Sequence, residues 1–384
     1  MLNSYSRCWC EIDYNAISHN VNEIRKLVGS TKIMGIVKAN AYGHGACRCA
    51  KELKKCGVDF FGVACVDEAL ELRQAGIDDP ILILGFTPYE HFHYLVEENL
   101  VQSLVSLTYA RDLNAYAKAQ DTKIHCHCKV DTGMCRTGIL YTDQKKDMDA
   151  IIEEYRLPNL SVEGIFSHFP VSDDLREEAK TFTTHQIELF EEVLKNLEKE
   201  QINPGIRHIQ NSYGILNYPH LKYDYCRPGL LYMGVTSDDQ IPIETNPDFI
   251  PILSLYANVS LVKWIYPGQT VSYGRHFIAE KKTKVATLSI GYADGLPRML
   301  SNKNYNVLIH GKACPIIGNI CMDQCMVDVT EVEDVVCGDV ACIIGKQEGQ
   351  MQTIDTISRM TNSINNETLC RISARVPRLD RREN

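Results

Sequence analysis

Short apolar runs alternate with amphipathic stretches through the first two-thirds of this chain, and this alternation constrains its fold most strongly. The runs are too short for helices, which predicts buried strands. Between them lie helical patterns; Ile17, Val21, Ile24 and Val28 share one helical face, and Asp13 precedes it as a candidate N-cap. Such alternation over about 240 residues is typical of an α/β protein built as a (β/α)8 TIM barrel. Eight strands are expected, at residues 33–37, 60–65, 81–84, 101–107, 124–130, 162–167, 206–210 and 224–232.

The pattern changes after residue 235. A polar, proline-containing stretch at residues 237–248 predicts a linker. Beyond it, turn residues separate short strand-like runs with little helix between them, which predicts a mostly-β domain. We therefore expect the N-terminal barrel at residues 1–244 and the C-terminal β domain at residues 245–384. The expected strands of the second domain are residues 253–262, 284–290, 306–309, 326–329 and 339–344.

Lys38 directly follows the first expected strand. The C-terminal ends of parallel strands are where barrel enzymes carry their chemistry. A lysine drawn towards an apolar strand end is desolvated, which lowers its pKa and favours a Schiff base. Taken alone, such a lysine is more often an ordinary surface residue, so the neighbouring residues must decide.

The charge and the cysteines exclude several functions. A formal net charge of -9 argues against a nucleic-acid partner. No apolar stretch reaches the roughly 20 residues of a membrane helix, and the first ten residues lack the core of a signal peptide. Sixteen cysteines occur without any C-x-x-C spacing, which favours free thiols in a cytoplasmic protein over a metal site. His125 and His127 share a strand face and could bind a metal, but we expect ordinary strand histidines and no metal.

Several motifs then appear in order along the chain. The run Val37-Lys38-Ala39-Asn40-Ala41-Tyr42-Gly43-His44-Gly45 resembles the pyridoxal-phosphate (PLP) lysine signature of the alanine racemase family. Later segments match further motifs of that family, so the resemblance covers nearly the whole chain. It implies a barrel with a β domain, PLP as cofactor, an amino acid as substrate and a homodimer with shared active sites. The later segments are Lys129 to Arg136, His208-x-x-Asn211-Ser212, Arg227-Pro228-Gly229-Leu230, Val271-Ser272-Tyr273-Gly274, Gly291 to Arg298 and Ile320 to Gln324.

The resemblance also implies roles for individual residues. Lys38 would carry PLP as a Schiff base and act as one base, and Tyr273 from the other subunit would act as the second. Arg227 would face the pyridine nitrogen and leave it unprotonated, because arginine rarely gives up a proton. Lys129, as a carbamate, would orient Arg136, and Arg298 would line the entrance. The implied cofactor-binding residues are Lys38, Tyr42, His168, Asn211, Ser212, Arg227, Gly229 and Leu230; the implied substrate-binding residues are Arg136, Met322, Asp323 and Asn366.

Asn366 departs from the family pattern. The family reads G-T-I-x-Y-E where this chain reads Asn-Ser-Ile-Asn-Asn-Glu over residues 362–367. Asparagine in place of tyrosine leaves room and a polar partner for a hydroxymethyl group. In this respect the chain looks like the racemase domain of vancomycin-resistance-type membrane serine racemases, which carry an N-terminal membrane region for which this sequence gives no signal.

The expected function is a two-base racemase of serine and alanine that supplies D-amino acids for cell-wall precursors. We expect it in the cytoplasm, or on the cytoplasmic side of the plasma membrane if the chain is part of a membrane-tethered protein. Three alternatives stay open: a plain alanine racemase with little serine activity, an amino-acid decarboxylase of the same architecture, and a non-catalytic PLP carrier. The second domain and Tyr273 argue against the carrier.

Overall fold

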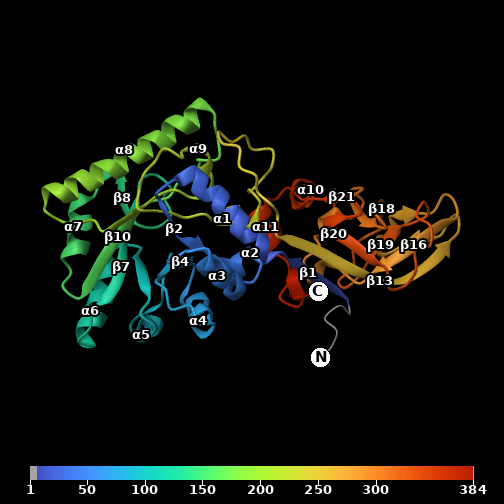
Figure 1. The fold of residues 1–384 in the computed structure, drawn as a ribbon, viewed down its shortest axis with the longest axis horizontal. Helices are drawn as coiled ribbons and strands as arrows, with labels where there is room; N and C mark the ends of the chain where they lie inside the picture. The colour runs from blue at the N-terminus through green and yellow to red at the C-terminus, as the bar shows by residue number, and fades with distance from the viewer. Residues whose placement is uncertain (1–6, 384) are drawn as a thin grey trace. The chain divides into compact units, whose positions relative to one another are not determined.

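The computed structural model describes residues 7–383, which form two compact units (Figure 1). The barrel unit holds residues 17–232 and 240–249. The β unit holds residues 7–16, 233–239 and 250–383.

The barrel unit is a closed ring of eight parallel strands, which confirms the expected fold class. The first strand is split at Met34 into β2 (Lys32–Ile33) and β3 (Gly35–Ile36). β2 pairs with the last strand and β3 with the second, so the two halves close the ring. The other strands, in pairing order, are β4 (Phe61–Val63), β5 (Ile81–Ile83), β6 (Val101–Leu104), β7 (Ile124–Asp131), β10 (Leu160–Phe166), β11 (Ile206–His208) and β12 (Tyr225–Cys226).

Helices accompany the strands of the barrel, and the helix predicted from the apolar face of residues 17–28 is present. In α1 (Tyr14–Val28), the four residues of the predicted apolar face are all fully buried, and the Asp13 carboxylate accepts a hydrogen bond from the Asn15 amide (3.1 Å). A small hairpin of β8 (Ile139–Thr142) and β9 (Lys145–Lys146) follows β7. The remaining helices are α2 (Lys38–Tyr42), α3 (Ala46–Lys55), α4 (Val66–Gln74), α5 (Phe92–Glu97), α6 (Leu107–Ala119), α7 (Met148–Arg156), α8 (Glu177–Lys199) and α9 (Ser212–Asn217).

The β unit is built on a mainly antiparallel sheet in which six strands pair in a closed circuit. The long strand β13 (Leu253–Ile265) pairs with both β16 and β20, and the strands between them complete the ring. This confirms the expected mostly-β character. The other members of the circuit are β16 (Thr283–Leu288), β17 (Asn306–Ile309), β18 (Lys312–Ile317), β19 (Cys325–Asp328) and β20 (Val340–Gln347).

Shorter elements complete the β unit. Two helices, α10 (Ile354–Met360) and α11 (Asn365–Cys370), follow the last hairpin. The remaining strands are β14 (Thr270–Val271), β15 (Phe277–Ile278), β21 (Gln350–Gln352) and β22 (Arg378–Asp380).

The unit boundaries differ from the expected division at residues 244 and 245. β1 (Cys8–Ile12) belongs to the β unit, because it pairs antiparallel with β13 and parallel with β22. Residues 240–249, expected as linker and start of the second domain, group with the barrel unit instead. Neither difference could be seen in a local pattern, since both depend on contacts with distant segments. None of the helices within residues 7–383 combines the length and the hydrophobicity that a membrane-spanning helix requires.

Candidate active site

Lys38 lies two residues beyond β3, at the C-terminal end of the first barrel strand, and is half-buried. This end of a (β/α)8 barrel is the one that carries catalytic groups. α2 then turns the chain with φ angles of 51–53° from Ala39 to Tyr42. Left-handed backbone at consecutive non-glycine residues is rare and strained, and strain of this kind concentrates at functional sites.

Tyr42, Ser212 and Gly229 meet at the ends of the first, seventh and eighth strands. The Gly229 amide donates to the Ser212 Oγ (3.1 Å). A Cβ at Gly229 would lie 2.4 Å from the Tyr42 hydroxyl oxygen, so only glycine permits this approach. Leu230 follows, buried, at the start of a short 3₁₀ helix. Two hydroxyls and neighbouring backbone amides form a group suited to phosphate oxygens.

Asn211 caps α9. Its Oδ1 accepts hydrogen bonds from the Gly214 amide (2.8 Å) and the Ser172 hydroxyl (2.9 Å), and its Nδ2 donates to the Phe169 carbonyl (3.2 Å). The side chain thus orients the helix that begins at Ser212. A direct cofactor contact through Asn211 stays a prediction.

Arg227 is buried at the centre of the strand ends. Its guanidinium donates to the Nδ1 atoms of His208 (2.6 Å) and His168 (3.1 Å), and to the Ser167 carbonyl (2.7 Å). Burial lowers the pKa of Arg227 to about 9, which still leaves it charged at pH 7. Burial, followed by the charge of Arg227, holds the pKa of His168 well below its usual value, so this imidazole is neutral.

The two histidines of β7 both bond to side chains of the protein. With its Nδ1 accepting from Arg227, His208 donates from Nε2 to the Nδ1 of His127 (2.9 Å). Burial lowers the pKa of His127 to about 3. His125 bonds instead to Glu163. No cluster of His, Cys, Asp and Glu within residues 7–383 has the arrangement of a metal site.

Lys129 lies at the end of β7, where its ammonium donates to the Thr137 hydroxyl (2.7 Å). Burial, then the charges of Arg136 and Arg227, lower the pKa of Lys129 to about 8. The charge of Asp131 raises the pKa of Lys129 and so opposes this shift. The Asp131 carboxylate itself accepts hydrogen bonds from backbone amides of its own loop, including that of Arg136 (2.9 Å). Lys129, Asp131, Arg136 and His168 line one small cavity.

The strand ends therefore carry a surplus of positive charge. After burial, the charges of four cations lower the pKa of His168. Arg227 and Lys129 are buried, and buried positive charge is costly unless it is compensated, so this site favours an anionic ligand. A phosphate group and a substrate carboxylate have the required charge, and PLP with an amino acid supplies both. The four cations are Arg227, Arg136, Lys129 and Lys38.

In the β unit, Tyr273 opens a short 3₁₀ helix and its side chain is 71% exposed. Its carbonyl accepts from the Asn319 Nδ2 (2.7 Å), and the preceding Ser272 donates to the Asn319 carbonyl (2.5 Å). The backbone at Tyr273 is thus fixed while the phenol projects outwards.

Met322 and Asp323 lie on the loop that follows Asn319. The Met322 carbonyl accepts from the Ala293 amide (3.0 Å), and the Asp323 carboxylate accepts from Arg375 (2.7 Å). Arg298 is exposed at the start of another 3₁₀ helix, η5 (Arg298–Leu300). The substrate and entrance roles of these three residues stay predictions.

Asn366 lies in the first turn of α11. Its Oδ1 is buried, and no hydrogen-bond partner reaches it among residues 7–383. A buried acceptor without a partner is unfavourable, by about 1–3 kcal/mol, and calls for an explanation such as a ligand.

Sequence reasoning missed two acidic residues, Glu68 and Asp294, which bond to segments that carry candidate site residues or lie next to them. Glu68 accepts from the backbone amide next to Lys38. Asp294, fully buried, accepts from both Arg7 and Arg375. Asp294 lies within the motif from Gly291 to Arg298, which was a possible signal for it. The resemblance implies a role only for Arg298, so Asp294 received none.

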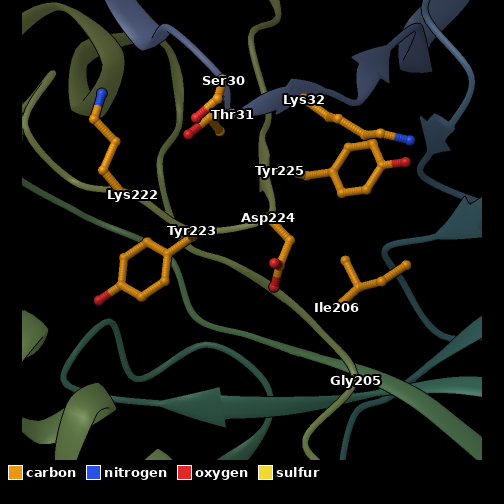
Figure 2. Close-up of a pocket in the computed structure, with 9 residues that line it drawn as sticks. All are labelled: Ser30, Thr31, Lys32, Gly205, Ile206, Lys222, Tyr223, Asp224 and Tyr225. Atoms are coloured by element: carbon orange, nitrogen blue, oxygen red, sulfur yellow. The ribbon is translucent and has the colours of Figure 1, made fainter.

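A second, open cavity of about 620 Å³ lies at the opposite rim of the barrel, where the strands begin (Figure 2). Lys32 and Lys222 lie on opposite sides of it and point away from each other. Lys32 pairs with Asp59 (2.7 Å), and Asp224 pairs with Arg207 (2.8 Å). Lys222 donates to the Val28 carbonyl (3.1 Å), so the cavity offers no cluster of positive charge comparable to that at the strand ends.

Comparisons with known proteins agree with this arrangement. The family model described as "Alanine racemase, N-terminal domain" matches residues 12–237, and "Alanine racemase, C-terminal domain" matches residues 252–380. Alanine racemase 2 of Caldanaerobacter subterraneus subsp. tengcongensis is 44% identical over 373 residues, which cover 96% of this chain and 93% of the relative. An amino-acid racemase of Enterococcus faecalis is 40% identical over 97% of this chain but only 51% of its own greater length.

A solved structure extends the likeness to the cofactor. Alanine racemase from Bartonella henselae, described with covalently bound pyridoxal phosphate, has a TM-score of 0.84 to this chain at 29% identity, covering 98% of this chain and 99% of the other. The family is PLP-dependent. With both of its models matched in order and 44% identity along nearly its full length, this chain belongs to the alanine racemase family and is a racemase, a class of isomerase.

Proposed function

We propose that this chain racemises alanine and serine with PLP carried on Lys38. The observation that carries the proposal is the surplus of positive charge at the barrel strand ends, to which Lys38 itself contributes. The phosphate of PLP and the carboxylate of an amino acid would neutralise that charge.

The hydroxyls of Tyr42 and Ser212 and the amides of Gly229 and Leu230 would hold the phosphate. Their convergence at the last two strand ends supports this role, because phosphate sites of barrels form there. Asn211 would act through Ser212, since it caps the helix that Ser212 begins.

Arg227 would donate a hydrogen bond to the pyridine nitrogen, and neutral His168 would lie against the ring. A guanidinium that keeps its proton at pH 7 leaves that nitrogen unprotonated. The ring is then a weaker electron sink, which restricts side reactions such as transamination. This supports a racemase over the decarboxylase alternative.

Lys38 and Tyr273 of the partner subunit would serve as the two bases, on opposite faces of the substrate. PLP, when bound, acidifies the α-hydrogen of the amino acid. One base then takes the proton at its Nζ or Oη while the other returns one, which inverts the centre. The 71% exposure of Tyr273 supports a role outside its own chain, and hence a head-to-tail homodimer.

Arg136 and the Met322 amide would bind the substrate carboxylate. Asp323, next to Met322, would also contribute to substrate binding. Lys129, whose pKa is lowered to about 8, is sufficiently deprotonated at mildly alkaline pH to form a carbamate with carbon dioxide. A carbamate would turn one of the four cations into an anion beside Arg136.

Serine activity rests on Asn366. Its buried Oδ1, which no partner reaches within the described part of the chain, would accept a hydrogen bond from the serine hydroxyl, which alanine lacks. The amino-acid racemase name of the Enterococcus faecalis relative supports a range wider than alanine. We further infer a cytoplasmic enzyme that supplies D-amino acids for cell-wall precursors. The second candidate is a plain alanine racemase with little serine activity.

The test is chiral analysis of the products formed from L-alanine and from L-serine with added PLP, with Lys38→Ala as the control. We expect D-enantiomers of both from the wild type and none from the variant, which should also lack the visible absorption band of bound PLP. D-alanine alone would favour the second candidate. An intact band in Lys38→Ala would refute the assignment of the lysine.

A further inference from the structure

The left-handed turn after Lys38 needs external support. Left-handed backbone is costly for any non-glycine residue, and four such residues follow one another from Ala39 to Tyr42. Conformations of this cost persist only where surrounding contacts impose them. The turn joins two parts of the proposed site, since Lys38 precedes it and Tyr42 ends it.

Glu68 provides that support at the entrance of the turn. It is the third residue of α4 and lies beside the ends of the first two barrel strands. Its Oε1 accepts from the Ala39 amide (2.6 Å), and its Oε2 accepts from the Ala64 amide (2.7 Å), one residue beyond β4. Short, charge-assisted bonds of this kind are about twice as strong as neutral ones.

Different groups support the exit of the turn. The Asn40 side chain accepts from the Ala46 amide (2.8 Å), and the Gly45 amide donates to the Asn40 carbonyl (3.0 Å). These later contacts do not involve Glu68, so the turn keeps them when Glu68 is replaced. The Ala39 amide, next to Lys38, donates to the Glu68 carboxylate and loses this partner.

We propose that Glu68 is a positioning residue for the reaction: it fixes the backbone next to Lys38 to the neighbouring strand end and so aligns Lys38 and Tyr42 together. The inference rests on the proposed function of Lys38. In the proposed site, the Lys38 amine lies at the reacting end of the cofactor and the Tyr42 hydroxyl lies at its phosphate. Without Glu68, these two groups are no longer held in a fixed position relative to each other. A misplacement of about 1 Å is enough to cost up to about 100-fold in rate.

The test replaces Glu68 with Gln and measures racemisation of alanine, PLP affinity by absorption titration, and thermal unfolding of the PLP-loaded protein. Gln keeps the size but points an NH2 group at one of the two backbone N–H donors. We expect kcat to fall about 10- to 100-fold and PLP to bind more weakly, with little change in KM for alanine. Glu68→Asp keeps both acceptors on a shorter side chain and should lie between Gln and wild type; it also serves if Glu68→Gln fails to fold.

The matched control is Asp67→Asn, in the same helical turn. It removes the same charge from an exposed residue that makes no bond to the Lys38 turn. If Glu68→Gln and Asp67→Asn behave alike, or if only KM rises in Glu68→Gln, the inference is wrong. A wild type that neither binds PLP nor racemises alanine overturns the proposed function, and this inference with it.

Discussion

Replacing Asp294 with Asn should destabilise the β unit by about 3 kcal/mol. The carboxylate is fully buried in a 3₁₀ helix, η4 (Tyr292–Asp294). Its Oδ1 accepts from Arg7 (3.0 Å) and Arg375 (2.7 Å), and its Oδ2 accepts from Arg7 (3.2 Å) and the Gly291 amide (2.8 Å). These bonds join the start of the chain, the η4 turn and the segment before β22.

The magnitude follows from the burial of the partners. Removing one member of a buried ion pair costs about 3–5 kcal/mol. The side chains of Arg7 and Arg375 are 39% and 41% exposed, so water can replace part of the lost interaction. Asn keeps the shape and one acceptor, but it turns an NH2 group towards a guanidinium. The lower end of the range is therefore expected.

The assay is urea unfolding followed by tryptophan fluorescence. The two tryptophans, Trp9 in β1 and Trp264 in β13, both lie in the β unit, so their emission reports on that unit. At a slope of about 2 kcal/mol per M, the midpoint should fall by about 1.5 M. Glu331→Gln, which breaks an exposed pair with Lys281, should change stability by less than about 1 kcal/mol. An Asp294→Asn loss no larger than that of this control would refute the reasoning.

The same residue predicts a pH dependence. Burial by itself raises the pKa of Asp294, but the hydrogen bonds from Arg7 and Arg375 outweigh it and hold the pKa below its ordinary value of 3.8. Because the pKa is lower in the folded state, the carboxylate stabilises the fold at neutral pH, and this contribution is lost as the pH falls through the folded pKa. The stability gap between wild type and Asp294→Asn should therefore narrow below pH 3.8; a constant gap would contradict the ion-pair account.

Two further predictions concern the proposed chemistry. Mixing inactive Lys38→Ala and Tyr273→Phe proteins under subunit exchange should restore activity, because a mixed dimer has one site with both bases; no recovery despite proven exchange would show that each chain builds its own site. Asn366→Tyr should lower kcat/KM for serine relative to kcat/KM for alanine, both measured at saturating PLP. The expected change in this ratio corresponds to about 1–3 kcal/mol of lost transition-state stabilisation. An unchanged ratio of the two substrates would show that Asn366 does not recognise the serine hydroxyl.

The sequence by itself determined the barrel and the place of Lys38. Apolar runs of strand length separated by helical periodicity are local signals, and each can be seen without knowing its partner. The same holds for the position of Lys38 directly after such a run, and for the motif that surrounds it. These features depend on neighbours along the chain, so sequence reasoning could identify them.

Tertiary structure alone decided where β1 belongs and how the chain turns after Lys38. Residues 8–12 look like any short apolar run, and only pairing with β13, far along the chain, assigns them to the β unit. The turn from Ala39 to Tyr42 contains two alanines, which favour right-handed helix. Its left-handed form occurs together with the hydrogen bond from the Ala39 amide to Glu68 and the close approach of Gly229 to Tyr42, contacts that exist only once the barrel has closed.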